Sequence, residues 1–445
     1  MKRLFILTML FIAVAVISLS ATIINIPADY ATIQSGIDVS SDGDTVLVQP
    51  GTYVENINFN GHGIILASLF LISGDTSHIH ETIINGDSVE TVIKIWSFPP
   101  HEFDQWPTIL GFTICNGRGE YGGGISCRYA SPFITNNVIT QNSTNRSGGG
   151  IFCWSGSNPI IVNNVISNNF ALEGGGLWIC YSYPTIDSNN IISNIAITMG
   201  GGISINCCSY DTLVISNTTI ACNEADYGGG VSAEYSTFEM SNVTITENLC
   251  VQSGAGLYLD ISYPTILNTI FWSNDASEIH INDEHSDPII TYCDIQGTLW
   301  PGEGNISTDP LFCDSDNLNF WLAENSPCVE TGQDEMNIGA YGVGCEATDI
   351  LEDIVSLPLN CLLKQNYPNP FNASTTISYS LSHFVNVKLD VYDPLGRHIE
   401  TIIDIDQSAG HYQVIWNAGG FPSGIYFYKI QAGDFIDTKK MLLLK

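Results

Sequence analysis

The stretch "YGGGISC", residues Tyr121–Cys127, places three consecutive glycines directly before a short apolar run. Glycine loses more conformational entropy on folding than any other residue, so an ordered triplet needs a structural reason. The arrangement recurs at intervals of 26, 26, 26, 28 and 26 residues, and a fixed period of this length indicates stacked structural units. The six runs, of which the last is Gly-Ala-Gly, begin at Gly122, Gly148, Gly174, Gly200, Gly228 and Gly254.

The residues after each triplet alternate as in a β-strand. The third position after the first glycine is apolar in all six units: Ile125, Ile151, Leu177, Ile203, Val231 and Leu257. The fifth position lies on the same face: Cys127, Cys153, Ile179, Ile205, Ala233 and Leu259. A second β-rich run follows in each unit, and no segment of the repeats has helical periodicity.

A 26-residue unit of two or three short strands cannot bury its apolar face alone. We therefore predict that each unit is one turn of a coil, stacked on the next about 4.8 Å away, with its aliphatic columns filling the interior. This fold is a parallel β-helix. The 28-residue unit has two extra residues within "NCCSYD", residues 206–211, and such a coil tolerates an insertion at a corner.

An asparagine follows the second run at nearly the same point of each unit. We predict a hydrogen-bonded ladder, because stacked amides can pair between turns and asparagine tolerates the left-handed backbone of a corner. The alternative is that asparagine is simply a common turn residue. The predicted ladder consists of Asn116, Asn142, Asn168, Asn194, Asn223, Asn248 and Asn274.

The first twenty residues, "MKRLFILTMLFIAVAVISLS", have the composition of a secretory signal peptide. A positive start precedes an apolar run, and Ser18 and Ser20 suit cleavage before Ala21. A transmembrane anchor is the alternative, but the apolar core is short for a span and no flanking charge follows it. We expect an exported chain with no membrane span after signal removal.

Charge is distributed unevenly along the chain. Residues 21–360 carry 39 acidic and four basic residues, whereas residues 361–445 carry seven of each sign. A surface this acidic repels nucleic acid and anionic membranes, and it suits calcium, neutral glycans or cationic partners. We therefore expect no nucleic-acid partner. The four basic residues of the first segment are Lys94, Arg118, Arg128 and Arg146.

Thirteen cysteines leave at least one without an intramolecular partner in a compartment that permits disulfides. No Cys-x-x-Cys pattern indicates zinc. Cys127 and Cys153 fall on adjacent turns of the predicted coil at a separation that is long for a disulfide. We expect them to be buried thiols.

The sequence predicts four segments of an all-β protein. Residues 1–20 are the signal peptide, and residues 21–345 form the β-helix, which a short amphipathic helix (31–39) caps at its open edge. The period fades after about residue 308, where we expect a closing coil. Residues 346–360 read as a linker, and residues 361–445 alternate like a small antiparallel β-sandwich of immunoglobulin-like type.

The segments "TIQSGI", "GDTVLVQPGTYVENI", "TILGFTICNG" and the "GGGI…SPFITNNVI" repeats resemble secreted right-handed β-helix proteins of the pectate-lyase-like superfamily. The closing "DPLF…SPC…TG…IGAYG" is also similar, so the resemblance covers residues 25–345. It implies the fold. The superfamily includes polygalacturonases, pectate lyases and pectin methylesterases, but the chain lacks Asn-Thr-Asp, Gly-His-Gly and Arg-Ile-Lys motifs. A pectate-lyase-like mechanism needs a basic residue beside calcium-binding carboxylates, and this segment contains only four basic residues.

The C-terminal segment "LKQNYPNPFNASTTISYSL", residues 363–381, is followed by "VKLDVYDPLGRHIETI", "AGHYQVIW", "SGIYFYKI" and "TKKMLLLK". This order resembles the C-terminal sorting domain of the bacterial type IX secretion system over the whole of residues 361–445. The resemblance implies that the type IX machinery is a partner. It also implies passage through the periplasm across the outer membrane, removal of the domain, and release or attachment of the cargo at the cell surface.

The strand after each triplet turns its second and fourth residues outward. These positions predict an exposed aromatic patch that suits stacking on sugar rings. The alternatives are that a loop covers the patch or that its members are ordinary β-formers. The patch consists of Phe152, Trp154 and Trp178, with Tyr181 adjoining.

Glu234 and Asp260 occupy the same outward column on neighbouring turns, with Cβ atoms about 5 Å apart. Paired carboxylates at this distance bind calcium or share a proton as an acid/base pair. The alternative is two solvated acids on a very acidic protein. His78 with His80, and His280 with Asp283 and His285, are weaker metal candidates that we interpret as turn residues.

The sequence favours an exported β-helix protein, on the cell surface or released, that binds glycans or acts as an adhesin-like module and needs no cofactor other than, as an option, calcium. Two alternatives are a polysaccharide lyase or glycoside hydrolase with its site on the outward face, and a non-catalytic structural surface protein. Turnover of a polysaccharide panel would favour the enzyme, retention without turnover would favour the binder, and neither would favour the structural protein.

Overall fold

The structure, a computed structural model, describes residues 21–97, 106–297, 299–346, 362–366, 368–381, 385–394, 396–407, 410–433 and 435–444. The chain divides into two compact units, Met1–Thr348 and Asp349–Lys445. The predicted signal peptide, and the predicted linker beyond residue 346, lie outside the described residues. In the part that is described, no helix has the length and apolar character needed to cross a bilayer.

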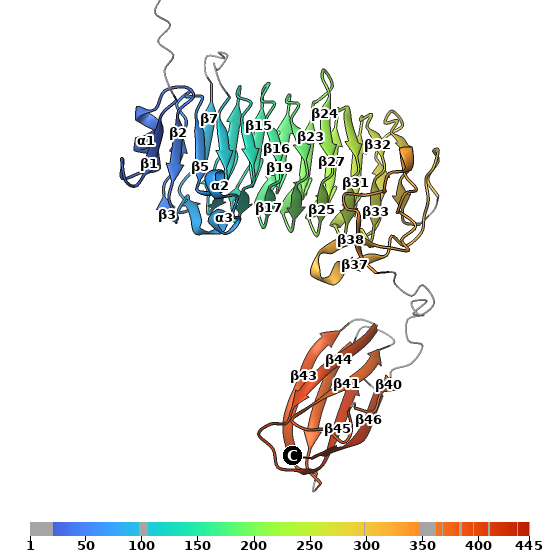
Figure 1. Cartoon of the computed structure of the whole chain (residues 1–445). Helices are drawn as coiled ribbons and strands as arrows, with labels where there is room; N and C mark the ends of the chain where they lie inside the picture. Colours follow the sequence, from blue (N-terminus) through green and yellow to red (C-terminus); the bar gives the residue numbers. More distant parts are fainter. Residues whose placement is uncertain are drawn as a thin grey trace, which may run out of the picture. The chain divides into compact units, whose positions relative to one another are not determined.

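The first unit is a coil in which equivalent strands of successive turns pair in parallel (Figure 1). The predicted parallel β-helix is confirmed. Each complete turn of the repeat region contributes one strand to each of four sheets, here named A, B, C and D, and a glycine triplet joins sheet D to sheet C.

Sheet A has eleven strands in the order β1 (Ile23–Ile26), β2 (Thr45–Val48), β5 (Ile65–Ser68), β8 (Thr108–Leu110), β12 (Phe133–Thr135), β16 (Ile160–Val162), β20 (Thr185–Asp187), β24 (Leu213–Ser216), β28 (Phe238–Ser241), β32 (Thr265–Leu267) and β35 (Ile289–Thr291). Sheet B has ten: β3 (Gly51–Val54), β6 (Thr82–Asn85), β9 (Thr113–Cys115), β13 (Val138–Thr140), β17 (Val165–Ser167), β21 (Asn190–Ile192), β25 (Thr219–Ala221), β29 (Thr244–Thr246), β33 (Ile270–Trp272) and β36 (Asp294–Ile295).

Sheet C has nine strands: β4 (Ile57–Asn58), β7 (Ile93–Trp96), β11 (Ile125–Arg128), β15 (Ile151–Trp154), β19 (Leu177–Cys180), β23 (Ile203–Asn206), β27 (Val231–Glu234), β31 (Leu257–Asp260) and β34 (Ile279–Ile281). Sheet D has six: β10 (Arg118–Gly119), β14 (Ser143–Thr144), β18 (Phe170–Glu173), β22 (Ile195–Met199), β26 (Glu224–Tyr227) and β30 (Leu249–Ser253).

The interior is one continuous column of aliphatic side chains. Ile125 pairs with Ile151, which pairs with Leu177, and the row continues in register through Ile203 and Val231. All of these side chains are fully buried. Each contributes about 1.5–3 kcal/mol by leaving water. Cys127 and Cys153 lie in the adjacent interior row as free thiols, as predicted.

A short helix caps the first turn. The helix α1 (Ile33–Val39) begins two residues later than predicted, because Thr32 and Ser35 form a capping box. Ile33 and Ile37 pack into the core of the coil. Two further helices, α2 (Phe70–Ser73) and α3 (Ser77–Glu81), follow β5. The helix α3 carries His78 and His80, whose segment we had interpreted as a turn.

The asparagine ladder forms with a membership that differs from the prediction. In each step, the side-chain amide of one asparagine donates to Oδ1 of the asparagine in the next turn, at 2.8–3.1 Å. The members are Asn142, Asn169, Asn194, Asn223, Asn248 and Asn274. Asn116 and Asn168, which we had included, lie outside the ladder.

Both misassigned asparagines occupy the corner position immediately before the ladder. Asn116 and Asn168 have left-handed backbone, with φ of 55° and 54°. Asn168 is exposed, whereas Asn169 is buried and occupies the ladder position. At each of the pairs Asn136–Asn137, Asn163–Asn164 and Asn168–Asn169, the first asparagine bends the chain and the second pairs. A second ladder, of Asn137, Asn164 and Asn189, forms at the preceding corner.

The C-terminal end of the coil carries a closing strap, defined here as residues 312–346. It contains β37 (Phe312–Asp314), η1 (Ser315–Asn317), β38 (Asn319–Ala323), η2 (Gln333–Glu335) and β39 (Val343–Cys345). We had predicted a closing coil, but the strap folds back across the outer face of sheet B. Tyr341 donates to Asn190 Oδ1 at 2.7 Å, and the amide of Ala340 donates to Thr244 Oγ1 at 3.0 Å. A disulfide joins Cys313 to Cys345.

The second unit consists of two antiparallel sheets around one core. One sheet contains β40 (Leu362–Leu363), β41 (Ser374–Leu381) and β44 (Gly410–Asn417). The other has the order β43 (His398–Gln407), β42 (Val385–Tyr392), β45 (Gly424–Ala432) and β46 (Phe435–Leu443). Trp416 and Tyr428 are among its largest buried side chains. This arrangement agrees with the predicted small β domain.

Candidate functional site

The candidate site lies on the outer face of sheet C. In-register pairing aligns the second and fourth residues of its strands in two outward rows. The first row is Lys94, Ser126, Phe152, Trp178, Ser204, Ser232 and Tyr258. The second row is Trp96, Arg128, Trp154, Cys180, Asn206, Glu234 and Asp260.

One side of this face is bordered by the glycine triplets and by the side chains of the residues that precede them. Gly122 has φ of +75°, and a Cβ there would lie 2.7 Å from the carbonyl oxygen of Ile125. The turn is therefore so tight that the residue before a triplet reaches across sheet C. The ring centroid of Tyr121 lies 5.3 Å from that of Phe152, and Glu173 Oε2 accepts a hydrogen bond from Trp178 Nε1 at 3.1 Å.

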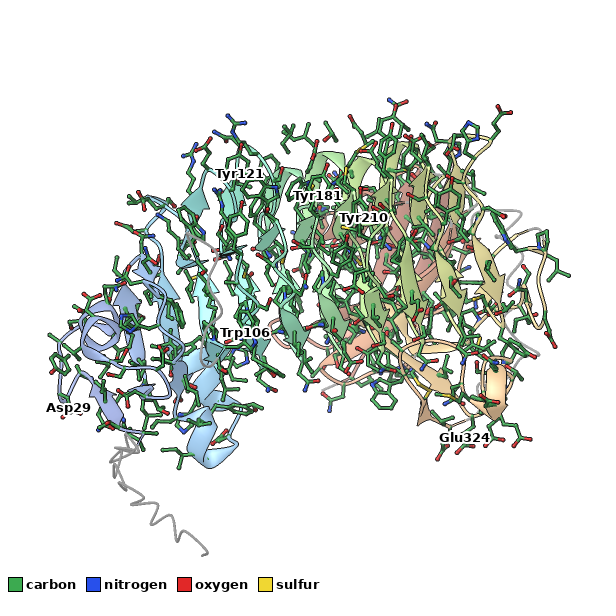
Figure 2. The ribbon with its side chains drawn as sticks, turned by 90° about the horizontal axis from the view of Figure 1, so that it is seen from above. Asp29, Trp106, Tyr121, Tyr181, Tyr210 and Glu324 are labelled. Atoms are coloured by element: carbon green, nitrogen blue, oxygen red, sulfur yellow. A yellow bond between two sulfur atoms is a disulfide. The ribbon has the colours of Figure 1, made fainter. Side chains whose placement is uncertain are left out.

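Phe152 was predicted to be exposed, but the structure shows that it is buried. Its side chain is only 2% exposed, because Tyr121 covers it on one side and the indole of Trp178 stacks on it at 4.9 Å. Trp154 and Trp178 are half-buried, and Tyr181 is half-exposed at the opposite rim. Figure 2 shows Tyr121, Tyr181 and Tyr210 at successive points along the coil. The exposed aromatic surface is therefore smaller than the predicted patch, and the buried Phe152 packs against the indole of Trp178.

Arg128 lies at the centre of an aromatic cluster. Its guanidinium carbon is 4.6 Å from the ring centroid of Trp96, 5.2 Å from Tyr121, 5.4 Å from Phe152 and 5.6 Å from Trp154. Each cation–π contact of this kind stabilises by about 0.5–1 kcal/mol. Burial lowers the pKa of Arg128 from its high ordinary value. The aromatic rings therefore hold this cation in a partly desolvated position.

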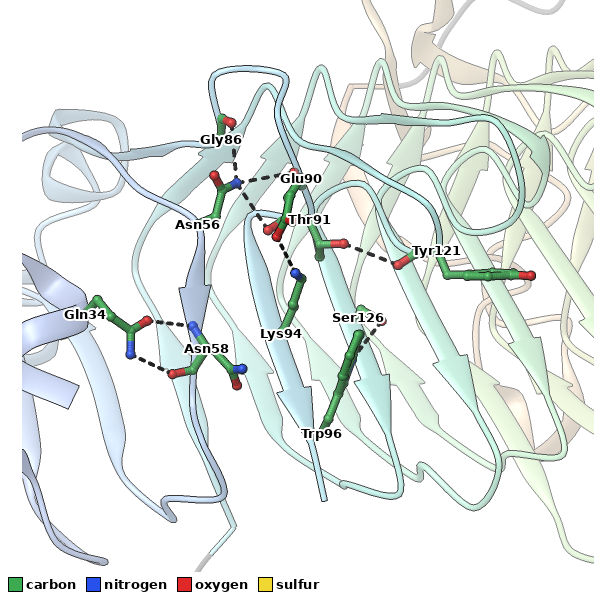
Figure 3. A network of polar contacts seen from close by, with 10 residues as sticks. All are labelled: Gln34, Asn56, Asn58, Gly86, Glu90, Thr91, Lys94, Trp96, Tyr121 and Ser126. Atoms are coloured by element: carbon green, nitrogen blue, oxygen red, sulfur yellow. Dashed lines mark hydrogen bonds and ion pairs between the residues drawn. The ribbon is translucent and has the colours of Figure 1, made fainter. Parts of the chain in front are cut away.

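Two adjoining cavities meet at Arg128. One, of about 310 Å³, lies over the indoles of Trp154 and Trp178, and the other, of about 400 Å³, extends past Trp96 to Lys94. Tyr121 and Arg128 line both. Figure 3 shows Lys94 pointing toward Glu90, and Trp96 beside Ser126, to whose hydroxyl it donates at 3.2 Å. Neither Trp96 nor Tyr121 is among the residues predicted for this site, although Trp96 stands in the same strand position one turn before Arg128.

The opposite end of the same face is acidic. Glu234 pairs in register with Asp260, as predicted. Burial, together with the negative charges of Asp260 and Glu173, raises the pKa of the Glu234 carboxyl. Asn282 donates to Asp260 Oδ1 at 3.0 Å. With its amide oriented to satisfy both atoms, Asn206 donates to Glu234 at 3.1 Å and accepts from Trp178 Nε1 at 3.2 Å. A polar network thus joins the aromatic and acidic parts.

The weaker metal candidates have other roles. The Ser286 hydroxyl donates to the Asp283 carboxylate and is the main cause that lowers the pKa of Asp283 to about 2. The backbone N–H groups of Ile261, His285 and Ser286 also donate to this carboxylate and lower its pKa further. His280 lies in strand β34 and not in the predicted turn, and its ring stacks on Tyr258 with the ring centroids 5.7 Å apart. Within the described ranges, no group of three or more His, Cys, Asp or Glu side chains is arranged to hold a metal.

Comparison with known proteins gives a family match for part of each unit. Residues 108–238 match the family described as "Right handed beta helix region", and residues 365–444 match "Secretion system C-terminal sorting domain". No curated protein matches the chain.

The fold and these matches define the class. The chain is a right-handed parallel β-helix protein with a C-terminal type IX sorting domain. This domain directs export through the type IX secretion system to the cell surface or the extracellular space, and it implies contact with that machinery.

Proposed function

We propose that this exported protein binds carbohydrate on the outer face of sheet C, as a surface glycan-binding or adhesin-like module. The observation that carries the proposal is the pair Trp154 and Trp178, whose half-buried indoles line a cavity of about 310 Å³. They stand on adjacent paired strands, so the coil fixes their positions before any ligand arrives. Rigid aromatic surfaces bind with little loss of conformational entropy.

Polar groups beside the indoles supply the directional contacts that a sugar needs. Arg128 lines the same cavity, and Glu173 and Asn206 lie next to Trp178. A binding site that combines apolar surface with a few fixed polar groups matches the amphipathic character of a sugar ring. The proposal therefore requires no rearrangement of the backbone.

The test is retention of the full chain on a panel of insoluble and immobilised polysaccharides. The Trp154→Ala/Trp178→Ala double variant is expected to lose retention. Trp321→Ala is the matched control, because Trp321 is also a partly exposed indole but lies on the closing strap, stacked on Tyr341. Equal retention by the wild type and the double variant would overturn the proposal.

A second candidate function is polysaccharide cleavage, favoured by the raised pKa of Glu234 beside Asp260. A raised pKa favours the protonated form of a carboxyl, and this form can act as a general acid. The same panel distinguishes this reaction through new reducing ends or unsaturated products, which Glu234→Gln is expected to abolish. Calcium binding at this pair is tested by calorimetric titration of the wild type and Asp260→Asn. If the panel shows neither retention nor turnover, a structural surface role remains.

We infer that the second unit is a sorting signal that is removed after export. After it has engaged the type IX machinery, its removal leaves the β-helix released or attached at the cell surface. Mass spectrometry of the protein recovered from the medium and the cell surface tests this step. Recovery of the full C-terminal unit on the mature protein would contradict it.

A further inference from the structure

All the cations of the β-helix gather at one place. Residues 21–346 contain only four basic residues. Lys94, Arg118 and Arg128 line the cavity of about 400 Å³, and Arg118 and Arg146 line a neighbouring one of about 760 Å³. In a segment so rich in acids, a random distribution would scatter them. Because the two cavities are lined by four basic and two acidic residues, this end of the outer face of sheet C is locally positive, whereas the rest of the domain is acidic.

Two of the four cations have no direct ion-pair partner among the described residues, although Glu90 and Glu120 also line the cavity of about 400 Å³. Lys94 forms an ion pair with Glu90, and Arg146 pairs with Glu120 at 3.1 Å. Among the described residues, Arg118 and Arg128 form no ion pair. Arg128 Nε is buried without a hydrogen-bond partner. The aromatic contacts of Arg128 engage ring surfaces and its Nε is buried, so the terminal Nη groups are the donors that remain for an oxyanion, to which arginine binds through paired hydrogen bonds.

The sign of the charge reverses along the outer face of sheet C. From Arg128 on β11 to Glu234 on β27 there are four strand spacings, or on the order of 20 Å. This distance exceeds the screening length of about 8 Å at physiological salt, so each end acts on its own part of a ligand. A chain with a negative charge on every sugar would meet Glu173, Glu234 and Asp260. A mainly neutral chain with one acidic group would not.

We propose that the glycan bound on this face carries an isolated oxyanion, either a carboxylate or a sulfate ester. The oxyanion is held by Arg118 and Arg128, and the neutral sugars that follow it stack on Trp154 and Trp178. The inference rests on the proposed glycan-binding function and adds the charge, polarity and orientation of the ligand.

The test is calorimetric titration of the full chain with defined oligosaccharides. The probes are a xylo-oligosaccharide with one terminal glucuronic acid, a galacto-oligosaccharide with one terminal sulfate, the unmodified counterpart of each, and polygalacturonate. One or both acidic probes are expected to bind about tenfold to hundredfold more tightly than their neutral counterparts. The preference is expected to fall with rising salt. The two acidic arms distinguish carboxylate from sulfate.

Arg118→Gln is expected to remove the preference for the acidic probes and to leave the affinity for the neutral probes unchanged. Arg128→Gln is expected to remove the preference and also to weaken binding of the neutral probes, because Arg128 lines the cavity over the indoles. Arg118 is exposed and does not line the cavity over the indoles, so Arg118→Gln tests the proposal even where Arg128→Gln disturbs the aromatic cluster. Equal affinity for acidic and neutral probes, equal loss of both in the Arg118 variant, or tightest binding of polygalacturonate would overturn the inference.

Failure of the glycan proposal is distinguished by titration with inorganic sulfate, followed by tryptophan fluorescence. Trp96 and Trp154 lie close enough to Arg128 to report on its environment. A sulfate response in the wild type that Arg118→Gln abolishes, without binding of any oligosaccharide, would support the anion pocket and reject the glycan platform. Absence of a response to any probe would reject both.

Discussion

Replacing Asn194 with alanine tests the ladder that the structure shows. Asn194 is fully buried, and its Oδ1 accepts from the backbone N–H of Asn169 at 3.0 Å and from its side-chain amide at 2.9 Å. Its Nδ2 donates to the carbonyl of Ile166 at 2.8 Å. In the alanine variant, the buried backbone N–H of Asn169 loses its acceptor and the carbonyl of Ile166 loses a donor. Because each unsatisfied buried group costs about 1–3 kcal/mol, we expect a destabilisation of about 2–6 kcal/mol.

Asn168→Ala is the matched control, since it removes the same side chain one residue before the ladder position Asn169. Asn168 is exposed, and alanine there loses only the tolerance of asparagine for φ of 54°, an effect of about 1 kcal/mol. The assay is urea denaturation of the full chain, followed by far-ultraviolet circular dichroism. Equal shifts of the midpoint in the two variants would refute the reasoning, because the ladder would then contribute nothing beyond corner geometry.

Three further predictions concern stability. Burial raises the pKa of Glu278 to about 7, so the protonated form favours folding, and the stability that it contributes is lost as pH rises through 7. Glu278→Gln is therefore expected to stabilise the protein by about 3 kcal/mol at pH 8 and to flatten the pH dependence of its thermal stability. An unchanged pH dependence in thermal melts would contradict this. Gly175→Ala places a Cβ 2.5 Å from a backbone carbonyl oxygen and is expected to cost more than about 3 kcal/mol or to prevent folding, whereas Gly156→Ala, with open space around it, is expected to cost about 1 kcal/mol by chemical denaturation. Cys313→Ser/Cys345→Ser is expected to destabilise the closing strap by about 2–4 kcal/mol and to expose it to limited proteolysis; a cleavage rate equal to that of the wild type would show that packing alone holds the strap.

The repeat architecture could be predicted because the same constraint recurs in every turn. The glycine triplets and the alternation after them specify the corner, the strand and the interior rows together. The asparagine ladder was predicted less accurately, since asparagine serves both the left-handed corner and the paired position beside it. Only backbone geometry separates Asn168 from Asn169.

The site was harder to predict, because exposure depends on what lies above a residue. The alternation showed that Phe152 points outward, but the tight turn that brings Tyr121 over it is a tertiary effect. The four basic residues were counted in the sequence analysis, but they lie 24, 10 and 18 positions apart, so their convergence follows only from the winding of the coil. The course of the closing strap across sheet B depends on contacts such as Tyr341 with Asn190 that carry no local signal.

The two edges of the outer face of sheet C differ in how much sequence change they accept. At the glycine edge, a side chain on Gly123, Gly149 or Gly175 would collide with backbone of the neighbouring turn, so that edge is fixed in both length and composition. At the other edge, the chain between Asn206 and Leu213 already carries the two additional residues, and Tyr210 there is 86% exposed. Proteins with this fold can therefore change their ligand by varying the loops that follow the strands of sheet C, while the strands and the glycine corners stay constant, much as a framework supports variable loops.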